Sequence, residues 1–341
     1  MFKVLTKDFI YNPALEMKIE EPTEEIQLFG KTYRMYKDEW KHHIHLKITN
    51  RCDAKCKFCI EKSSRDDYEN VIQFLESARL LIWSMHTQGH FKTISITGGE
   101  PTLSPVLQNT IRTCLCCKPK LLSINTNGYA IGAIEPNTFK GWLNISKHSI
   151  DDRAIFKRSW NLDIGQILAF KERQKNANVR LQCVLGAKGG LESQADIDNF
   201  IDHFKDCADD FSFRSLIIED AQGSVDPLFW AFRDKLFQSG CLEEQAIQDY
   251  YVYEIYNYKD KKVTLSWSNM ALLKEHNETY NDNFLEEIIV HPDGKITGSW
   301  NKKTLKIYDP YAPEKCRSCQ YLDNGCRYGS SSDGCGGGSC Y

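Results

Sequence analysis

Three cysteines stand close together near the start of the chain. Cys52, Cys56 and Cys59 have the spacing C-x3-C-x2-C and follow the apolar run HIHLKIT at 43–49. Three thiolates can hold three irons of a cubane cluster, which normally takes four cysteines. No fourth ligand is evident nearby, so one iron would stay open to an exchangeable molecule. Buried structural cysteines or a zinc knuckle are the alternatives, but a zinc knuckle usually pairs two C-x2-C arms or adds a histidine.

A second motif, Gly98-Gly99-Glu100-Pro101, directly follows a short apolar run at 93–97. Glycines let a backbone approach a ligand closely, and a carboxylate can accept hydrogen bonds from an ammonium group. Ordinary turn chemistry is the alternative for these four residues alone. Their position one strand–helix unit after the cysteine loop favours a shared site.

These two motifs together resemble the radical S-adenosylmethionine (SAM) superfamily, and Phe58 fills the aromatic position of that family's C-x3-C-x-aromatic-C signature. The resemblance covers about residues 43–220. It implies a [4Fe-4S] cluster on the three cysteines and SAM bound along the Gly98–Pro101 edge. An electron from a flavodoxin- or ferredoxin-type donor would cleave SAM and release a 5′-deoxyadenosyl radical. That radical would abstract a hydrogen atom from the substrate.

Further SAM contacts are implied by the same resemblance. Asn125 begins the sequence Asn-Thr-Asn-Gly, which is similar to a turn common in the family. Ser146 corresponds to a serine that contacts the SAM ribose, and Arg158 to an arginine aimed at the SAM carboxylate. A solvated arginine is the alternative at that position. Leu185 would supply an apolar or backbone contact to adenine.

Candidate catalytic residues come from the polar positions around the expected strands. Alternation sends His43 to one strand face, His148 follows the expected strand 142–146, and Glu219 ends the strand 211–218. Each could meet the substrate at the rim of the site. The alternatives are a hydrogen-bonded structural histidine, a solvated loop and a helix cap.

The last 26 residues hold a second cluster of cysteines. These residues resemble the SPASM and twitch extensions of radical SAM enzymes, which hold auxiliary iron–sulfur clusters. Ser299 stands where such extensions carry a further cysteine, and the spacing is stretched after the third cysteine. We expect one auxiliary cluster rather than two, with zinc as the alternative. The expected ligands come from Cys316, Cys319, Cys326, Cys335 and Cys340.

Short apolar strands alternate with amphipathic helices between residues 43 and 240, which predicts parallel pairing with right-handed crossovers. We count about six such units, so the expected fold is α/β, a partial (β/α)6 TIM-like barrel. The expected domains are an N-terminal extension at 1–42, the barrel at 43–240 and a small Cys-rich α+β domain at 241–341. The expected strands are 43–49, 93–97, 121–126, 142–146, 179–185 and 211–218, and the expected helices are 68–87, 104–116, 163–175, 192–207 and 226–238.

Turn signals predict three hairpins outside these units: one around Gly30, one at 251–267, and one at Pro292-Asp293-Gly294. The net charge of -3 provides no electrostatic argument for nucleic acid or an anionic membrane as partner. No secretory signal is recognised, and the best apolar run, at 78–85, is too short to span a membrane. We therefore expect a cytoplasmic protein.

Three functions are compatible with these motifs. The first is a radical SAM enzyme that modifies a peptide or protein side chain, because many relatives with Cys-rich tails do so. The forty residues before the barrel are too few for a complete leader-binding domain, which weakens this choice, but the Cys-rich tail still favours it slightly over the second. The second is radical modification or cyclisation of a small molecule or nucleotide. The third, a non-enzymatic iron–sulfur or zinc scaffold, explains the cysteines but not Gly98–Pro101.

Overall fold

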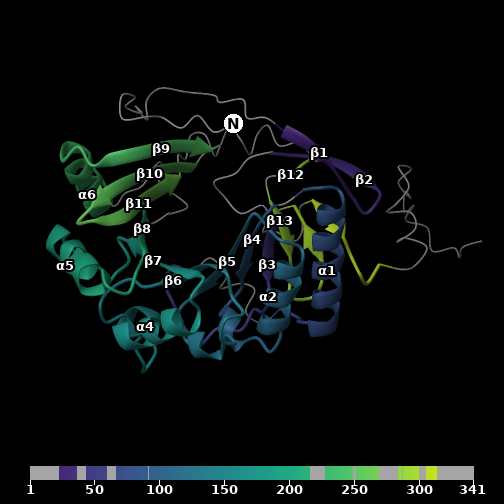
Figure 1. Ribbon diagram of the computed structural model, residues 1–341, viewed down its shortest axis with the longest axis horizontal. Coiled ribbons are helices and arrows are strands. Elements are labelled where there is room, and N and C mark those ends of the chain that lie inside the picture. The colour runs from purple at the N-terminus through teal and green to yellow at the C-terminus, as the bar shows by residue number, and fades with distance from the viewer. Residues whose placement is uncertain are drawn as a thin grey trace, which may run out of the picture.

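A long, curved sheet organises the protein. The computed structural model describes residues 23–36, 44–59, 67–90, 92–215, 227–248, 251–268, 283–285, 287–298 and 305–312. Twelve strands form the main sheet, in the order β15-β14-β13-β3-β4-β5-β6-β7-β8-β11-β10-β9. Figure 1 shows the strands as an arc with helices along its outer side.

Six consecutive parallel strands form the centre of this sheet. They are β3 (Ile44–Lys47), β4 (Thr93–Thr97), β5 (Leu121–Thr126), β6 (Gly141–Ser146), β7 (Ala177–Leu185) and β8 (Asp210–Ser215). The helices between and after them are α1 (Val71–Thr87), α2 (Leu107–Cys116), α3 (Arg153–Phe156), α4 (Ile164–Arg173), α5 (Gln194–Phe204) and α6 (Pro227–Gln238). The predicted alternation of strand and helix is confirmed, and the parallel pairing brings the carboxyl ends of the strands to one edge.

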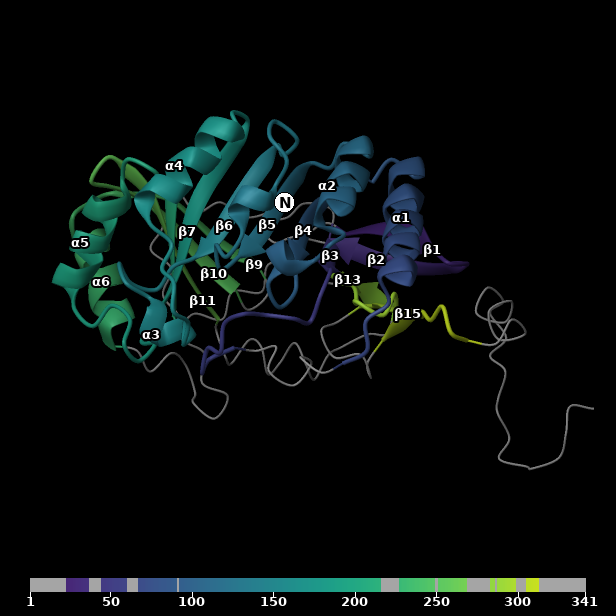
Figure 2. The same cartoon turned by 90° about the horizontal axis from the view of Figure 1, so that it is seen from below.

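The two faces of the parallel strands differ in chemistry because successive side chains point to opposite faces. One face is apolar: Ile94 and Ile96 of β4 and Leu143 and Ile145 of β6 belong to the buried core. Helices α1, α2, α4 and α5 lie on that side in both views (Figures 1 and 2). The other face is polar, and we call it the polar face; its members include Ser95, Asn125, Asn144, Arg180, Asp210 and Ser212.

The predicted hairpins at 251–267 and 292–294 are confirmed and extend this sheet. Strands β10 (Tyr251–Tyr258) and β11 (Lys261–Ser268) pair antiparallel, and β11 pairs parallel with β8. At the other end β13 (Ile288–Val290) pairs parallel with β3 and antiparallel with β14 (Ile296–Thr297). Strands β9 (Leu242–Gln248) and β15 (Lys306–Tyr308) close the two ends. Strands from both sides of residue 240 thus share one sheet.

The N-terminal hairpin is also confirmed. Strands β1 (Thr23–Leu28) and β2 (Lys31–Tyr36) pair antiparallel around Phe29 and Gly30, whose φ angles of 50° and 80° are both positive. Such a turn matches the twist of the two strands, and glycine adopts its second position without steric cost. Strand β12 (Phe284–Leu285) joins β2 in a separate three-stranded sheet.

One helix and three strands were not predicted: α3, β9, β12 and β15. Helix α3 is a single turn, too short to show helical periodicity in the sequence. Strand β9 follows directly after α6 and takes its place by pairing with β10. Among the described residues, no helix is both long enough and apolar enough to cross a membrane.

Candidate functional site

The cysteine loop follows β3 at the carboxyl edge of the sheet. Cys52, Cys56 and Cys59 are each half-buried and none is in a disulfide. The backbone N–H of Lys55 donates to the carbonyl of Phe156 at 2.8 Å, which fixes the middle of the loop to α3. The three thiols therefore lie on one anchored loop and keep access to solvent.

The two glycines after β4 pack directly against the start of this loop. The N–H of Gly99 donates to the carbonyl of Thr49, and the N–H of Glu100 to that of Arg51, both at 2.8 Å. A Cβ on Gly98 would lie 2.3 Å from the carbonyl oxygen of Thr49, and one on Gly99 would lie 2.3 Å from that of Arg51. Gly98 also has a φ of 144°, which favours glycine. Both glycines are needed because the two backbones approach so closely.

Glu69 holds the same segment from the other side. Its Oε1 accepts hydrogen bonds from the N–H of Asn50 and, at 3.0 Å, from the hydroxyl of Thr49. Its Oε2 lies 3.7 Å from the Nε of Arg51. Glu69 lies just before α1, so the first helix contributes to the position of the cysteine loop.

Glu100 is completely buried, and its carboxylate is already hydrogen-bonded within the protein. Oε1 accepts from the N–H and hydroxyl of Thr102, at 3.0 and 2.6 Å, and from the hydroxyl of Thr126. Oε2 accepts from the N–H of Asn127 at 2.6 Å. Burial raises the pKa of Glu100, while these four donors oppose the rise. In this structure Glu100 joins the ends of β4 and β5; acceptance from a SAM ammonium group stays a prediction.

Asn127, in the turn after β5, connects this buried carboxylate to the cysteine loop. Its side-chain Nδ2 donates to Asp53 Oδ1 at 2.7 Å and lies 3.9 Å from the Sγ of Cys52. Its Oδ1 accepts from the N–H of Tyr129 at 2.9 Å. Asn125, and not Asn127, is the residue of this motif that was expected from the sequence to contact SAM. The Asn-Thr-Asn-Gly turn was a signal, but only the fold shows which asparagine reaches the cysteines.

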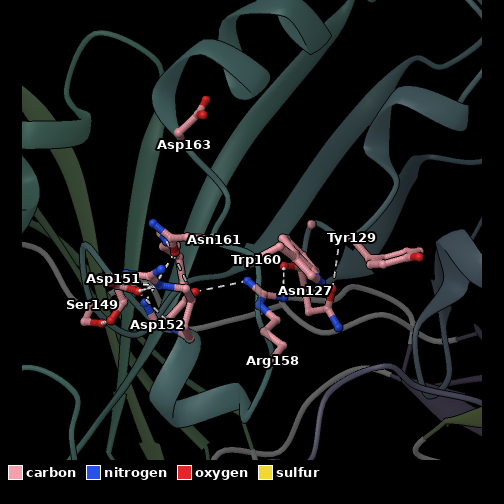
Figure 3. A network of polar contacts seen from close by, with 12 residues as sticks. Asn127, Tyr129, Ser149, Asp151, Asp152, Arg158, Trp160, Asn161 and Asp163 are labelled. Atoms are coloured by element: carbon pink, nitrogen blue, oxygen red, sulfur yellow. Dashed lines mark hydrogen bonds and ion pairs between the residues drawn. The ribbon is translucent and has the colours of Figure 1, made fainter.

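Arg158 lies in a buried charge cluster next to this turn (Figure 3). Its Nη2 donates to Asp152 Oδ1 at 3.0 Å and its Nη1 to the carbonyl of Asn127 at 3.2 Å. The guanidinium carbon lies 3.4 Å from the ring centroid of Trp160. Lys147 lies on the other side of Asp152, at 3.4 Å. Arg158 is thus already paired within the protein, and its contact with the SAM carboxylate stays a prediction.

Burial controls the ionisation of this cluster. The side chains of Lys147 and Asp152 are both fully buried. Burial lowers the pKa of Lys147 and raises the pKa of Asp152, and the attraction between the two opposes both changes. One carboxylate faces two cationic side chains, so a positive charge is left over when all three are ionised. Such a site suits an anion.

His148 packs beside the cysteine loop. Its ring makes an edge contact with Phe58 at a centroid distance of 5.0 Å and lies 5.2 Å from Phe156. Nδ1 accepts from the N–H of Val184 at 3.1 Å, so the ring can carry its proton only on Nε2 while neutral. Burial, reinforced by Lys147 and Arg158, lowers the pKa of His148 to about 3. At neutral pH His148 is therefore an uncharged ring, and a catalytic role for it stays a prediction.

The remaining described candidates lie along the ends of the strands. Asn125 Nδ2 donates to Ser95 Oγ at 2.8 Å, and its Oδ1 accepts from Asn144 at 2.9 Å. Ser146 is half-buried on the same polar face. The side chain of Leu185 belongs to the core and is 0% exposed, so only its backbone could face a ligand. Pro101 is buried at the start of a short helical turn.

Several predicted site residues lie outside the described residues. Among the catalytic candidates these are His43 and Glu219. The whole proposed auxiliary site does so too, with Ser299 and the ligands Cys316, Cys319, Cys326, Cys335 and Cys340.

The donor set of the cysteine loop fits a cluster better than a single ion. In the part of the chain that the structure describes, no group of three His, Cys, Asp or Glu side chains could hold one metal ion. In a cubane each thiolate binds a different iron, so three thiols on one loop are a suitable ligand set. Soft thiolate ligands are also the ones that iron–sulfur clusters select.

A family model described as Radical SAM superfamily matches residues 46–202, which include the cysteine loop and Gly98–Pro101. The chain contains a radical SAM domain. This domain indicates an enzyme and implies a [4Fe-4S] cluster and SAM as cofactors. Radical SAM enzymes act on their substrates together with a reductant.

Among known proteins, this chain is similar to GTP 3',8-cyclase of Tolumonas auensis, with 25% identity over 159 residues. That match covers 45% of this chain and 47% of the relative. The GTP 3',8-cyclase of Trichormus variabilis is 28% identical over 116 residues, 32% of this chain and 35% of that protein. The matched regions thus span at most about half the length of these relatives.

The solved structure of Streptococcus suis SuiB has a similar fold. Its TM-score is 0.51 at 15% sequence identity, and the match covers 82% of this chain and 65% of SuiB. At this identity the similarity concerns the fold alone.

We predict that Gly99→Ala destabilises the protein and loosens the cysteine loop. The new Cβ would overlap the carbonyl oxygens of Arg51 and Asn50, at 2.3 and 2.6 Å, and backbone atoms cannot move aside cheaply. Overpacking of this kind costs about 1–3 kcal/mol, measured by urea denaturation. Gly132→Ala is the control, because its Cβ would meet only a side-chain atom at 3.5 Å. Equal stability of the two variants would contradict this explanation.

We also predict that His148 makes stability depend on pH. The unfolded chain binds a proton below about pH 6.5, whereas the folded ring does so only near pH 3. The contribution of neutral His148 to the free energy of unfolding is therefore fully present above pH 6.5. It is lost as the pH drops toward 3, with a slope approaching about 1.4 kcal/mol per pH unit. His148→Gln keeps an acceptor for the N–H of Val184 but cannot take up a proton. Its free energy of unfolding, measured by urea denaturation at several pH values, should therefore fall less between pH 6.5 and pH 3 than that of wild type. The exposed His203→Gln is the control; parallel curves for His148→Gln and wild type would refute the assignment.

Proposed function

We propose that this protein is a radical SAM enzyme that cleaves SAM reductively at the carboxyl edge of its parallel sheet. One observation carries the proposal: the backbone hydrogen bonds of Gly99 and Glu100 to Thr49 and Arg51. They hold the Gly98–Pro101 motif against the first residues of the cysteine loop. The two motifs that the family uses for SAM and for the cluster therefore lie side by side.

In this proposal the chain's own residues bind and orient the cofactors. Cys52, Cys56 and Cys59 would hold the cluster, and the Gly98–Pro101 edge, which contacts the start of the cysteine loop, would bind SAM. When bound, the cluster and SAM supply a 5′-deoxyadenosyl radical that abstracts a hydrogen atom from the substrate. Arg158 and Lys147 make the adjacent buried region electropositive around Asp152, which favours an anionic group such as a carboxylate.

The SAM-binding residues that the resemblance implies remain part of the proposal. Phe58 lies next to His148, and the ends of the strands carry Asn125 and Ser146 on the polar face. Leu185 can contribute only through its backbone. Among the catalytic candidates, His148 would act as a neutral ring, and His43 and Glu219 stay predictions from the sequence.

We propose further that the six central strands form a partial (β/α)6 barrel around the substrate, with the domain boundaries expected from the sequence. One auxiliary iron–sulfur cluster on the C-terminal cysteines, a flavodoxin- or ferredoxin-type donor and a cytoplasmic location complete this proposal. None of the nine cysteines in the described part of the chain is in a disulfide, which suits a reducing compartment. The non-enzymatic scaffold would not need the close approach of Gly98 and Gly99 to the cysteine loop.

The polar face favours a small polar substrate. Ser95, Asn125 and Asn144 form a hydrogen-bonded row across β4, β5 and β6. Two buried oxygens, Asn144 Oδ1 and Asp210 Oδ1, have no hydrogen-bond partner among the described residues. A buried acceptor without a donor is costly, so these atoms suit a ligand rich in N–H and O–H groups. A nucleotide meets that requirement, and the named relatives are GTP 3',8-cyclases.

A peptide or protein side chain is the second candidate substrate. It is supported by the cysteine pattern of the C-terminal tail, which resembles SPASM and twitch extensions. Peptide maturases of the family often carry such tails. The two candidates differ in what should stimulate SAM cleavage.

The cluster assignment predicts two separable metal sites. Anaerobically reconstituted wild type should contain about eight irons per chain and form 5′-deoxyadenosine with dithionite and SAM. The triple variant Cys52/Cys56/Cys59→Ala should keep about four irons and form none. The single variant Cys116→Ala, at an exposed helical cysteine, should behave as wild type. If the purified protein binds only zinc, or cleaves no SAM with any reductant, the radical SAM proposal is contradicted and the non-enzymatic scaffold is favoured.

The substrate assignment predicts that GTP binds to the polar face. GTP should raise the rate of 5′-deoxyadenosine formation, and Asn144→Ala should weaken GTP binding about tenfold because one buried hydrogen bond is lost. The stimulation is measured as the rate of 5′-deoxyadenosine formation, and GTP binding is measured by equilibrium dialysis. Asn109→Ala, at an exposed position of α2, is the control. If neither GTP nor the other ribonucleoside triphosphates stimulate the reaction, the peptide candidate takes precedence.

A further inference from the structure

Both the backbone and the side chain of Asn127 are hydrogen-bonded, although this residue lies in a turn. Only 7% of its surface is exposed. Its N–H donates to Glu100 Oε2, and its carbonyl accepts from Arg158 Nη1 at 3.2 Å. The preceding strand β5 and the following residues therefore hold its backbone rigidly.

The orientation of the Asn127 amide follows from these contacts. Oδ1 accepts from the backbone N–H of Tyr129 at 2.9 Å, and an N–H can only donate. The amide oxygen must therefore face Tyr129, and the amide nitrogen must face the cysteine loop. One Nδ2 hydrogen points to Asp53 Oδ1 at 2.7 Å, and the other is available to Cys52 Sγ at 3.9 Å.

We infer that Asn127 is a positioning residue that raises the reduction potential of the cluster on Cys52, Cys56 and Cys59. This inference rests on the proposed function, because it requires that cluster. Hydrogen bonds to the sulfur ligands of an iron–sulfur cluster are one of the factors that set its potential. An N–H donor stabilises the reduced cluster more than the oxidised one, since the reduced cluster carries one more negative charge.

Asp53 makes this donor more important. Its carboxylate is adjacent in sequence to Cys52, and negative charge near the cluster opposes reduction. Asn127 Nδ2 occupies one carboxylate oxygen, and Trp160 Nε1 donates to the other at 3.2 Å. Asn127 therefore donates both toward the thiolate and to the nearest carboxylate, whereas the Trp160 N–H donates to the carboxylate and not to the thiolate.

This difference provides a matched pair of variants. Asn127→Leu keeps the approximate shape of the side chain and removes both N–H donors. Trp160→Phe removes the donor to Asp53 and keeps an aromatic ring beside Arg158. If bracing of the loop were the only role of Asn127, the two variants would change the potential alike.

The test is a mediated potentiometric titration of the reconstituted full-length protein without SAM, followed by electron paramagnetic resonance of the reduced cluster. The signal of the Cys52/Cys56/Cys59→Ala variant is subtracted to remove any second cluster. Iron and sulfide content are measured for every sample. We expect Asn127→Leu to keep wild-type iron content and to lower the reduced-to-oxidised ratio at a fixed potential about tenfold, or about 59 mV for one electron. Trp160→Phe should stay near wild type.

The possible outcomes separate this inference from the proposed function. Equal potentials for wild type and Asn127→Leu, with full clusters, would overturn the role of Asn127 and leave the proposed function intact. An equal fall in both variants would assign the effect to Asp53 and overturn the inference as well. Wild-type protein that binds no cluster on the three cysteines would refute the proposed function first. Should Asn127→Leu not fold, Asn127→Ser decides, and an unchanged potential with its shorter side chain would contradict the inference.

Discussion

The close approach of two backbones at the carboxyl edge of the sheet is the constraint on which the site depends. The residues after β4 hydrogen-bond to the residues after β3, and no Cβ fits at Gly98 or Gly99. The cost in conformational entropy of two adjacent glycines is offset by a fixed start for the cysteine loop. Neighbouring parallel strands end at the same edge, so this contact follows directly from the pairing of β3 with β4.

Buried polar groups carry this constraint further along the edge. Glu100 joins the end of β4 to the turn after β5, and Asn127 joins that turn to the cysteine loop and to Arg158. Each of these groups is buried, and losing one partner would leave another unsatisfied. The arrangement is therefore rigid before any cofactor binds. Preorganisation of this kind reduces the reorganisation needed during the reaction.

The two faces of the sheet differ in role: the apolar face stabilises the fold, and the polar face carries the groups proposed to meet the substrate. The apolar face packs against helices and supplies the core, as the row Ile96, Ile124 and Leu143 across β4, β5 and β6 illustrates. The polar face contributes little apolar burial but collects hydroxyl, amide and charged groups from successive strands. A parallel sheet is usually apolar on both faces when helices cover both. The polar face is therefore the surface that the proposed polar substrate would contact.

The sequence by itself determined the local elements and the chemistry of the main motifs. Alternation at 93–97 and the turn at Gly30 depend on neighbouring residues, so both were predicted correctly. The spacing of Cys52, Cys56 and Cys59 likewise depends on a short segment. Only the tertiary structure decided which partners Glu100, Asn127, Arg158 and His148 have. Strand register sets those contacts, and local pattern carries no information about groups that folding brings together from distant parts of the chain.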